Sequence, residues 1–92
     1  MKKKIAILGS TGSIGKTTYD IIKKNSKDFS VQLLSTNTNV SRIIKQAKIL
    51  KVKNIIISSK KHYLIAKKKK YKQFKIHNNF NYNNKIFKKK ID

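Results

Sequence analysis

The chain has 92 residues, enough for one domain or part of one, and its 24 Lys and Arg against three acidic residues give a net charge of +21. The absence of cysteine excludes disulfide bonds and cysteine-ligated zinc and is compatible with a reducing cytosol, so we expect a cytoplasmic protein. No apolar run approaches the roughly 18 residues of a membrane-spanning helix, and glycines interrupt the first apolar stretch too early for a signal peptide.

The positive charge is almost wholly lysine, since Arg42 is the only arginine. Lys, Asn, Ile, Tyr and Phe have A+T-rich codons, so a biased genome would produce this charge without selection for a polyanionic partner. Nucleic-acid sites also favour arginine for its two-pronged contacts. We therefore do not expect a nucleic-acid partner, and a small basic nucleic-acid-binding protein remains an alternative hypothesis.

The first predicted elements are a strand, a glycine-rich turn and a helix. The apolar segment Lys4–Leu8 predicts a buried strand, and the turn Gly9–Gly15 follows it. A helix is predicted from about Ser13 to Lys24, because four side chains recur there at helical spacing. These are Ile14, Thr18, Ile21 and Ile22.

A second strand and a second helix come next. Phe29–Leu34 predicts the strand, and the polar segment Ser35–Asn39 predicts a loop. An amphipathic helix follows, with Asn39 as its N-cap. Its apolar face consists of Val40, Ile43, Ile44, Ala47 and Leu50.

The remaining segments give a progressively weaker pattern. Lys53–Ser58 holds three isoleucines and predicts a third buried strand. A further helix is predicted over His62–Lys70, with Leu64 and Ile65 facing inward, and Gln73–His77 fits a fourth strand. Residues 78–92 are rich in Lys and Asn without a usable period, so we expect a poorly ordered tail after a domain of residues 1–77.

The alternation of strands and helices predicts an α/β fold. The same alternation predicts a parallel sheet with right-handed crossovers, and the connections are short, as such units require. We expect an incomplete Rossmann-like unit, βαβαβ, with helices packed on the sheet.

Glycines at positions 9, 12 and 15 separate the first strand from the first helix. This is the context of a dinucleotide-binding turn, in which Gly9 turns the chain, Gly12 admits a pyrophosphate to the backbone, and Gly15 lets the helix pack closely on the sheet. The backbone N–H groups of Gly12, Ser13 and Ile14 would then face the phosphates at the helix start.

A P-loop nucleotide binder is the rival interpretation, because Gly15-Lys16-Thr17 matches the second half of that motif. Its first glycine would stand at position 10, which is Ser10. No acidic residue follows an apolar strand to help hold magnesium. The P-loop interpretation is therefore disfavoured.

The end of the second predicted strand indicates which dinucleotide would bind. Enzymes that use NAD usually place a carboxylate there for the ribose 2′-hydroxyl. Here the residues are Ser35 to Asn39, with Arg42 one turn later. These hydroxyls, amides and the nearby cation could bind a 2′-phosphate, which favours NADP. The alternative interpretation is an ordinary polar loop without a role in binding.

Two segments, KKIAILGSTGSIGKTTYDII and NSKDFSVQLLSTNTNVSRIIKQAKILKVKNIII, closely resemble the amino terminus of the 1-deoxy-D-xylulose 5-phosphate reductoisomerases. The seven-residue turn Gly-Ser-Thr-Gly-Ser-Ile-Gly is the most specific part of the match. The resemblance covers residues 2–58 well and fades by about residue 77.

The resemblance implies an NADPH-dependent enzyme of non-mevalonate isoprenoid biosynthesis. Members rearrange and reduce 1-deoxy-D-xylulose 5-phosphate to 2-C-methyl-D-erythritol 4-phosphate, use a divalent cation such as Mg²⁺ or Mn²⁺, and are usually homodimers. The residues implied to contact NADPH are Thr11, Gly12, Ser13, Ile14 and Asn39.

Two positions depart from the family pattern. The family usually has glycine where this chain has Asn37 and often a cation where it has Thr38, so these two positions are weaker candidates for contact with the cofactor than the other five. Asparagine tolerates a left-handed backbone better than most residues, which would preserve the loop.

The family's metal-binding acids, substrate-phosphate site and flap correspond to no part of this sequence. Three Asp, no Glu, and the separate His62 and His77 give no metal cluster. We therefore expect the amino-terminal part of a cofactor-binding domain, from a fragment or a truncated gene, that is inactive on its own.

Overall fold

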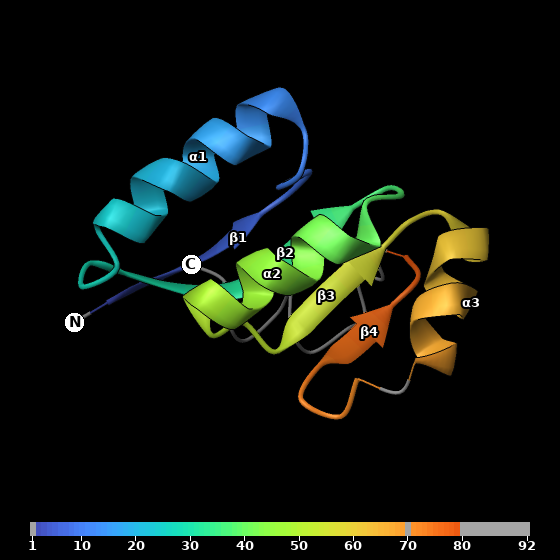
Figure 1. The fold of residues 1–92 in the computed structure, drawn as a ribbon. Coiled ribbons are helices and arrows are strands. Elements are labelled where there is room, and N and C mark those ends of the chain that lie inside the picture. The colour runs from blue at the N-terminus through green and yellow to red at the C-terminus, as the bar shows by residue number, and fades with distance from the viewer. Residues whose placement is uncertain (1, 70, 80–92) are drawn as a thin grey trace.

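The computed structural model describes residues 2–69 and 71–79. In this part of the chain, strands and helices alternate, as Figure 1 shows. The elements are β1 (Lys3–Ile7), α1 (Ser13–Lys24), β2 (Phe29–Thr36), α2 (Val40–Leu50), β3 (Asn54–Ile57), α3 (Lys60–Lys68) and β4 (Lys75–His77). None of the helices in the described part is long and apolar enough to cross a membrane.

The described strands form one parallel sheet in the order β1-β2-β3-β4, which confirms the predicted α/β class. Each strand is added on the same side of the one before it, so right-handed crossovers place successive helices on one face of the sheet. The main hydrophobic cluster agrees, because Ile22 of α1, Ile43 of α2 and Ala66 of α3 all belong to it.

An irregularity in β2 decides which of its apolar residues face the helices. Ile5 of β1 pairs with Val31 but Ala6 pairs with Leu33, so the register shifts by one residue at Gln32. Val31 therefore lies in the main cluster, whereas Leu33 lies with Ile56 and Ala6 in a second, smaller cluster. Strict alternation would have placed Val31 and Leu33 on the same face.

Helices α1 and α2 begin and end where the sequence predicts, but the predicted inner face of α1 is only partly right. Ile14 is 84% exposed and Ile21 is 54% exposed. The residues that α1 buries are Gly15, Tyr19 and Ile22. The helix packs through a glycine and a tyrosine, which a search for aliphatic spacing does not select.

Helix α3 begins two residues earlier than predicted because Ser59 caps it. The Ser59 Oγ accepts a hydrogen bond from the backbone N–H of His62 at 3.5 Å. The predicted inward positions Leu64 and Ile65 were wrong, since they are 47% and 43% exposed. Ala66 is the buried residue of this helix.

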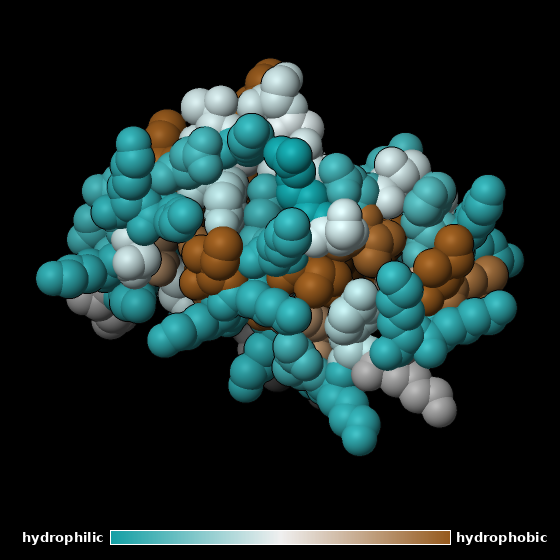
Figure 2. Space-filling model, in the orientation of Figure 1, coloured by the Kyte–Doolittle hydropathy of each residue, from teal (hydrophilic) through white to brown (hydrophobic). Residues whose placement is uncertain are grey.

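The strands begin and end close to their predicted positions. β1 and β3 lie within one residue of prediction at each end, and β4 is two residues shorter than predicted at its start. Figure 2 shows a largely hydrophilic surface broken by small hydrophobic patches, as a lysine-rich chain requires. The tail predicted from residue 78 falls almost entirely outside the described residues.

Candidate functional site

The turn between β1 and α1, residues 8–12, is a tight backbone structure that depends on Gly9 within it and on Gly15 in the first turn of α1. Gly9 has φ of 67°, in the left-handed region. A Cβ on Gly15 would lie 1.9 Å from the carbonyl oxygen of Gly9. The predicted close approach of Gly15 is therefore present, but its neighbour is the backbone of the turn itself rather than the sheet.

Gly12 forms the N-cap of α1 and provides no side-chain cap. Its own N–H donates to the Gly9 carbonyl at 3.0 Å. This N–H is therefore not available to a ligand, although the sequence predicted that it would face the phosphates. The N–H groups of Ser13 and Ile14 have no hydrogen-bond partner within the described residues. By contrast, Asn39 and Ser59 cap α2 and α3.

A cavity of about 530 Å³ opens on this uncapped helix start. Gly12, Ser13 and Ile14 line it together with Leu8, which follows β1. A Cβ on Gly12 would approach the turn only to 3.5 Å, an ordinary contact. Packing within the chain thus does not require glycine at position 12.

The end of β2 supports the turn through buried hydroxyls. The sequence predicted a loop from Ser35, but Ser35 and Thr36 continue the strand and pair with β3. Ser35 Oγ accepts from the N–H of Gly9 at 2.8 Å, and Thr36 Oγ1 lies 2.6 Å from Thr11 Oγ1. These bonds satisfy side chains that would otherwise be costly to bury.

The predicted residues of the second loop lie beside the turn but are more exposed. The backbone N–H of Asn39 donates to Thr36 Oγ1, which also bonds Thr11, so Asn39 and Thr11 share one partner. Asn37 accepts from Ser58 Oγ through its Oδ1 at 2.9 Å. Lys51 is the one non-glycine residue with positive φ in the described part, so Asn37 needs no left-handed backbone. Thr38 is exposed.

Ser10 and Gln46 are supporting residues that the sequence analysis did not select. Ser10 is fully buried, and its carbonyl accepts from Gln46 Nε2 at 2.9 Å. A P-loop would have its first glycine at this position, whereas here an interior serine is held from α2. Gln46 lies beside the apolar face of α2. The presence of a polar residue at this position was the only feature of the sequence that could have indicated its supporting role.

The shifted titratable groups lie away from the turn. Burial, and secondarily the charge of Asp20, raises the pKa of Tyr19, and burial with Lys67 and Lys75 lowers the pKa of His77. Within the described residues no group of three or more His, Asp, Glu or Cys side chains could hold a metal ion. The turn offers N–H groups and hydroxyls, which suit binding of an anion rather than acid–base chemistry.

The sequence profile described as 1-deoxy-D-xylulose 5-phosphate reductoisomerase matches residues 5–90. The reductoisomerase of Pelagibacter ubique is 48% identical over 86 residues, covering 92% of this chain and 22% of that protein. That of Porphyromonas gingivalis is 49% identical over 63 residues, covering 68% and 16%. The similarity thus extends beyond the residue 77 at which the sequence analysis expected it to fade.

A solved structure shows the same fold. The reductoisomerase from Zymomonas mobilis in complex with NADPH matches with a TM-score of 0.77 and 28% sequence identity. The match covers 85% of this chain and 21% of that one. This chain therefore spans about a fifth of the length of the relatives it matches most fully.

Proposed function

Because this chain belongs to the 1-deoxy-D-xylulose 5-phosphate reductoisomerase family, we propose that its glycine turn binds NADPH. The observation that carries the proposal is the uncapped start of α1, where the N–H groups of Ser13 and Ile14 open on a cavity without a partner among the described residues. The helix dipole adds partial positive charge at the same place. The cofactor named in the Zymomonas mobilis complex is the ligand that such a site suits.

Each residue of the proposed site has its own part. Ser13 and Ile14 donate backbone N–H groups to the pyrophosphate, and Gly12 leaves space for it. Thr11 and Asn39 fix the distance between the turn and the loop after β2 through their shared partner Thr36. The exposed side chain of Ile14 offers an apolar surface to a ring of the cofactor.

The choice of NADP over NAD follows from the loop after β2. Asn37, Thr38 and Asn39 carry no negative charge, so nothing in the loop repels a 2′-phosphate. The single arginine, Arg42, stands in the first turn of α2. A loop that binds NAD usually has a carboxylate here, which would repel that phosphate.

The reaction of the complete enzyme is proposed on family grounds: rearrangement and reduction of 1-deoxy-D-xylulose 5-phosphate to 2-C-methyl-D-erythritol 4-phosphate. The divalent cation and the homodimer belong to the same proposal. The described residues do not fit a cation, since they contain no suitable group of ligands. A polypeptide of these 92 residues should therefore bind cofactor without turnover, and steady NADPH oxidation above blank with substrate and Mn²⁺ would contradict this.

The binding proposal is tested by NMR titration of the ¹⁵N-labelled chain with NADPH. We expect the amides of Gly12, Ser13 and Ile14 to shift first and to saturate. Shifts spread over the lysines, and abolished by moderate salt, would instead indicate non-specific polyanion binding. Binding of Mg²⁺–ATP that depends on Lys16 would favour the P-loop alternative.

A further inference from the structure

Helix α3 exposes the two large aliphatic side chains that its sequence pattern predicts to face inward. Leu64 is 47% exposed and Ile65 is 43% exposed, whereas the residue that the helix buries completely is the small Ala66. A helix that packs on a sheet normally buries its largest apolar residues and turns its polar face to water. A place where the local pattern and the fold disagree in this way is expected to have a function.

Lysines surround these two exposed side chains. In an α-helix, Lys61 and Lys68 stand about one turn before and after Leu64 on the same face, since residues three and four apart are neighbours there. Figure 2 shows a hydrophobic patch over α3 that is bordered by hydrophilic side chains. The exposed lysines of the helix and its C-cap are Lys60, Lys61, Lys67, Lys68 and Lys69.

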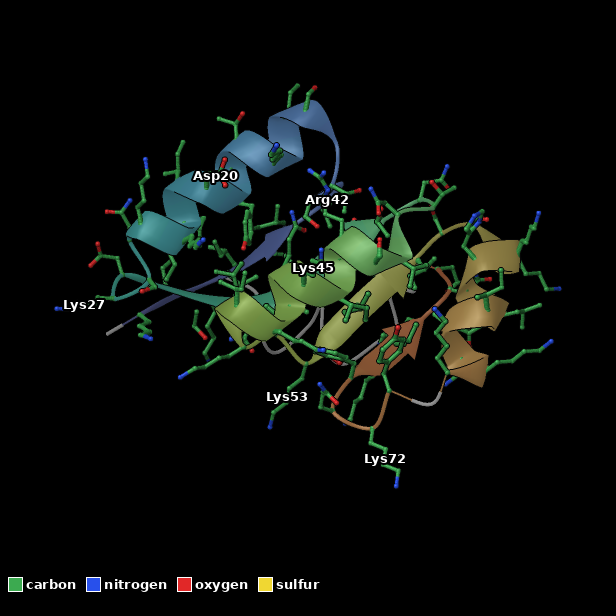
Figure 3. All side chains as sticks on the ribbon, viewed as in Figure 1. Asp20, Lys27, Arg42, Lys45, Lys53 and Lys72 are labelled. Atoms are coloured by element: carbon green, nitrogen blue, oxygen red, sulfur yellow. The ribbon has the colours of Figure 1, made fainter. Side chains whose placement is uncertain are left out.

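The charges of the chain are distributed unevenly between the two edges of the sheet. Helix α1 follows β1 at one edge and α3 precedes β4 at the other, as Figure 1 shows. The acidic residues of the described part, Asp20 and Asp28, belong to α1 and to the turn after it. Figure 3 shows Asp20 on α1 and Lys72 projecting from the segment between α3 and β4. Residues 60–79 contain no carboxylate that would offset the lysines of α3.

Aliphatic side chains among lysines suit the surface of an anionic lipid bilayer. The ammonium groups are attracted to negative head groups, while the apolar stems of the lysines and the aliphatic side chains enter the boundary with the acyl chains. A second copy of this chain is a poor partner, because its own lysines would repel those of α3. Single-stranded nucleic acid is bound through basic grooves and stacking aromatic rings, so it would leave Leu64 and Ile65 in water.

We propose that the outer face of α3, formed by Lys61, Leu64, Ile65 and Lys68, binds the surface of anionic lipid bilayers. Leu64 and Ile65 insert among the head groups, and the lysines lie against the negative charges. The contact is peripheral and requires no membrane-spanning helix. It is independent of the proposed cofactor site, since it uses no residue of the glycine turn or of the loop after β2.

A single tryptophan tests where the bilayer touches the chain, because the sequence contains none. Leu64→Trp is titrated with vesicles of phosphatidylglycerol and phosphatidylcholine in equal proportion, and with vesicles of phosphatidylcholine alone. We expect the tryptophan emission to move to shorter wavelength with the anionic vesicles and to stay unchanged with the neutral ones. Ile21→Trp is the matched control, since Ile21 is 54% exposed on α1, and it should show no shift. Equal shifts at the two positions, or none at position 64, would overturn the proposal.

Vesicle flotation then measures which side chains contribute to the affinity of the 92-residue chain. Replacing Lys61 and Lys68 together by Gln should weaken binding to the anionic vesicles at least about tenfold. Replacing Lys23 and Lys24 by Gln removes the same charge from exposed positions at the end of α1 and should weaken it less than about threefold, because salt screens distant charges. Equal losses in the two double variants would show non-specific attraction of a basic chain and would overturn the proposal.

Leu64→Ser keeps the net charge and tests the aliphatic part of the contact. It should weaken vesicle binding about fivefold, as loss of a partly buried leucine side chain requires. Circular dichroism checks that this variant folds, which is expected because Leu64 is exposed. Vesicle binding equal to that of the wild type would contradict an inserted side chain.

A short single-stranded oligonucleotide separates a bilayer contact from general binding of polyanions. We expect it to bind the wild type and Leu64→Ser equally, with an affinity that falls steeply as salt is added. An oligonucleotide that shifts the emission of Leu64→Trp as much as the vesicles do, and that binds Leu64→Ser more weakly than the wild type, would assign this face to nucleic acid and overturn the proposal.

Discussion

Gly12 and Gly15 stand three residues apart, but a side chain would meet very different surroundings at the two positions. At Gly15 a Cβ would be 1.9 Å from the Gly9 oxygen and 2.8 Å from the Ser10 Cα, both backbone atoms. At Gly12 the nearest atom is an ordinary 3.5 Å away. Packing within the chain thus requires glycine at position 15 and does not require it at position 12.

We predict that Gly15→Ala lowers the free energy of unfolding by about 1–3 kcal/mol or more, because α1 must move away from the turn. Urea unfolding followed by circular dichroism measures the change. Thr17→Ala is the control, since Thr17 is exposed and lies on the same helix. A Gly15→Ala protein as stable as wild type would show that the turn relaxes without cost.

His77 is a second residue whose surroundings predict a measurable effect. Burial, together with the charges of Lys67 and Lys75, lowers its pKa below the ordinary 6.5, and its Nε2 is buried without a partner in the described part. The unfolded chain therefore binds the proton more readily than the folded chain. The stability contributed by neutral His77 is present above the ordinary imidazole pKa and is lost as the pH falls toward the lowered value.

Unfolding measured at about pH 7.5 and about pH 5.5 should therefore show a less stable protein at the lower pH. His77→Gln, which does not titrate, should reduce this difference. An unchanged difference in the variant would mean that other groups cause the pH dependence.

At the scale of elements, α1 differs from α2 and α3 in having no side-chain cap. Gly12 has φ of −76° and ψ of 174°, an extended conformation that serine adopts readily. A serine there would satisfy N–H groups that now face the cavity. The helix end without a side-chain cap is the end where the proposed cofactor binds, so stability and binding are in competition at this residue.

Gly12→Ser should therefore raise the free energy of unfolding by a few tenths of a kcal/mol, or leave it unchanged, because serine is a good N-cap. The same change should weaken NADPH binding at least about tenfold, since its Oγ would accept from the N–H of Ile14 or Gly15 and would fill the space for the pyrophosphate. Urea unfolding and NMR titration provide the two measurements. A variant that binds NADPH as well as wild type would mean that the uncapped donors do not hold the phosphates.

The elements also show where sequence patterns are sufficient and where they fail. The ends of α1 and the Asn39 cap of α2 depend on neighbours in sequence and were predicted correctly. Ser35 and Thr36 were assigned to a loop because they are polar, yet they are strand residues whose hydroxyls bond Gly9 and Thr11, some 25 residues away. These partners come together only in the folded sheet, so a local sequence pattern does not indicate them.

The candidate site also has some features that the sequence predicted and others that it did not. The glycine spacing predicted the turn and its place at the start of α1, because backbone sterics are local. The partners that hold the turn were not predicted, since Gln46 reaches Ser10 across 36 residues. No sequence pattern showed that the N–H of Gly12 donates to the Gly9 carbonyl, whereas those of Ser13 and Ile14 have no partner in the described part.

At the scale of the whole molecule, 24 basic residues against three acidic ones make charge repulsion a general cost of folding. The described part of the folded chain brings its charges together in a body with a radius of gyration of 12.4 Å, whereas the unfolded chain spreads them apart. Added salt screens this repulsion because the Debye length falls to about 10 Å at about 0.1 M.

We therefore predict that the melting temperature rises as NaCl is increased from about 0.02 M to about 0.3 M, with most of the gain at the low end. Differential scanning calorimetry follows the change. A melting temperature that falls over this range would show that attractive ion pairs, rather than repulsion, dominate the folded state.

The sheet order β1-β2-β3-β4 is also the order in which its strands are synthesised. Each new strand can add to an edge that already exists, through a single crossover and without threading past earlier segments. Ribosomal synthesis therefore supplies the strands in the order in which they lie in the sheet, and β2 brings Ser35 and Thr36 to the glycine turn. Because Ser35 and Thr36 also pair with β3, the glycine turn reaches its full set of contacts only when the third strand has been added.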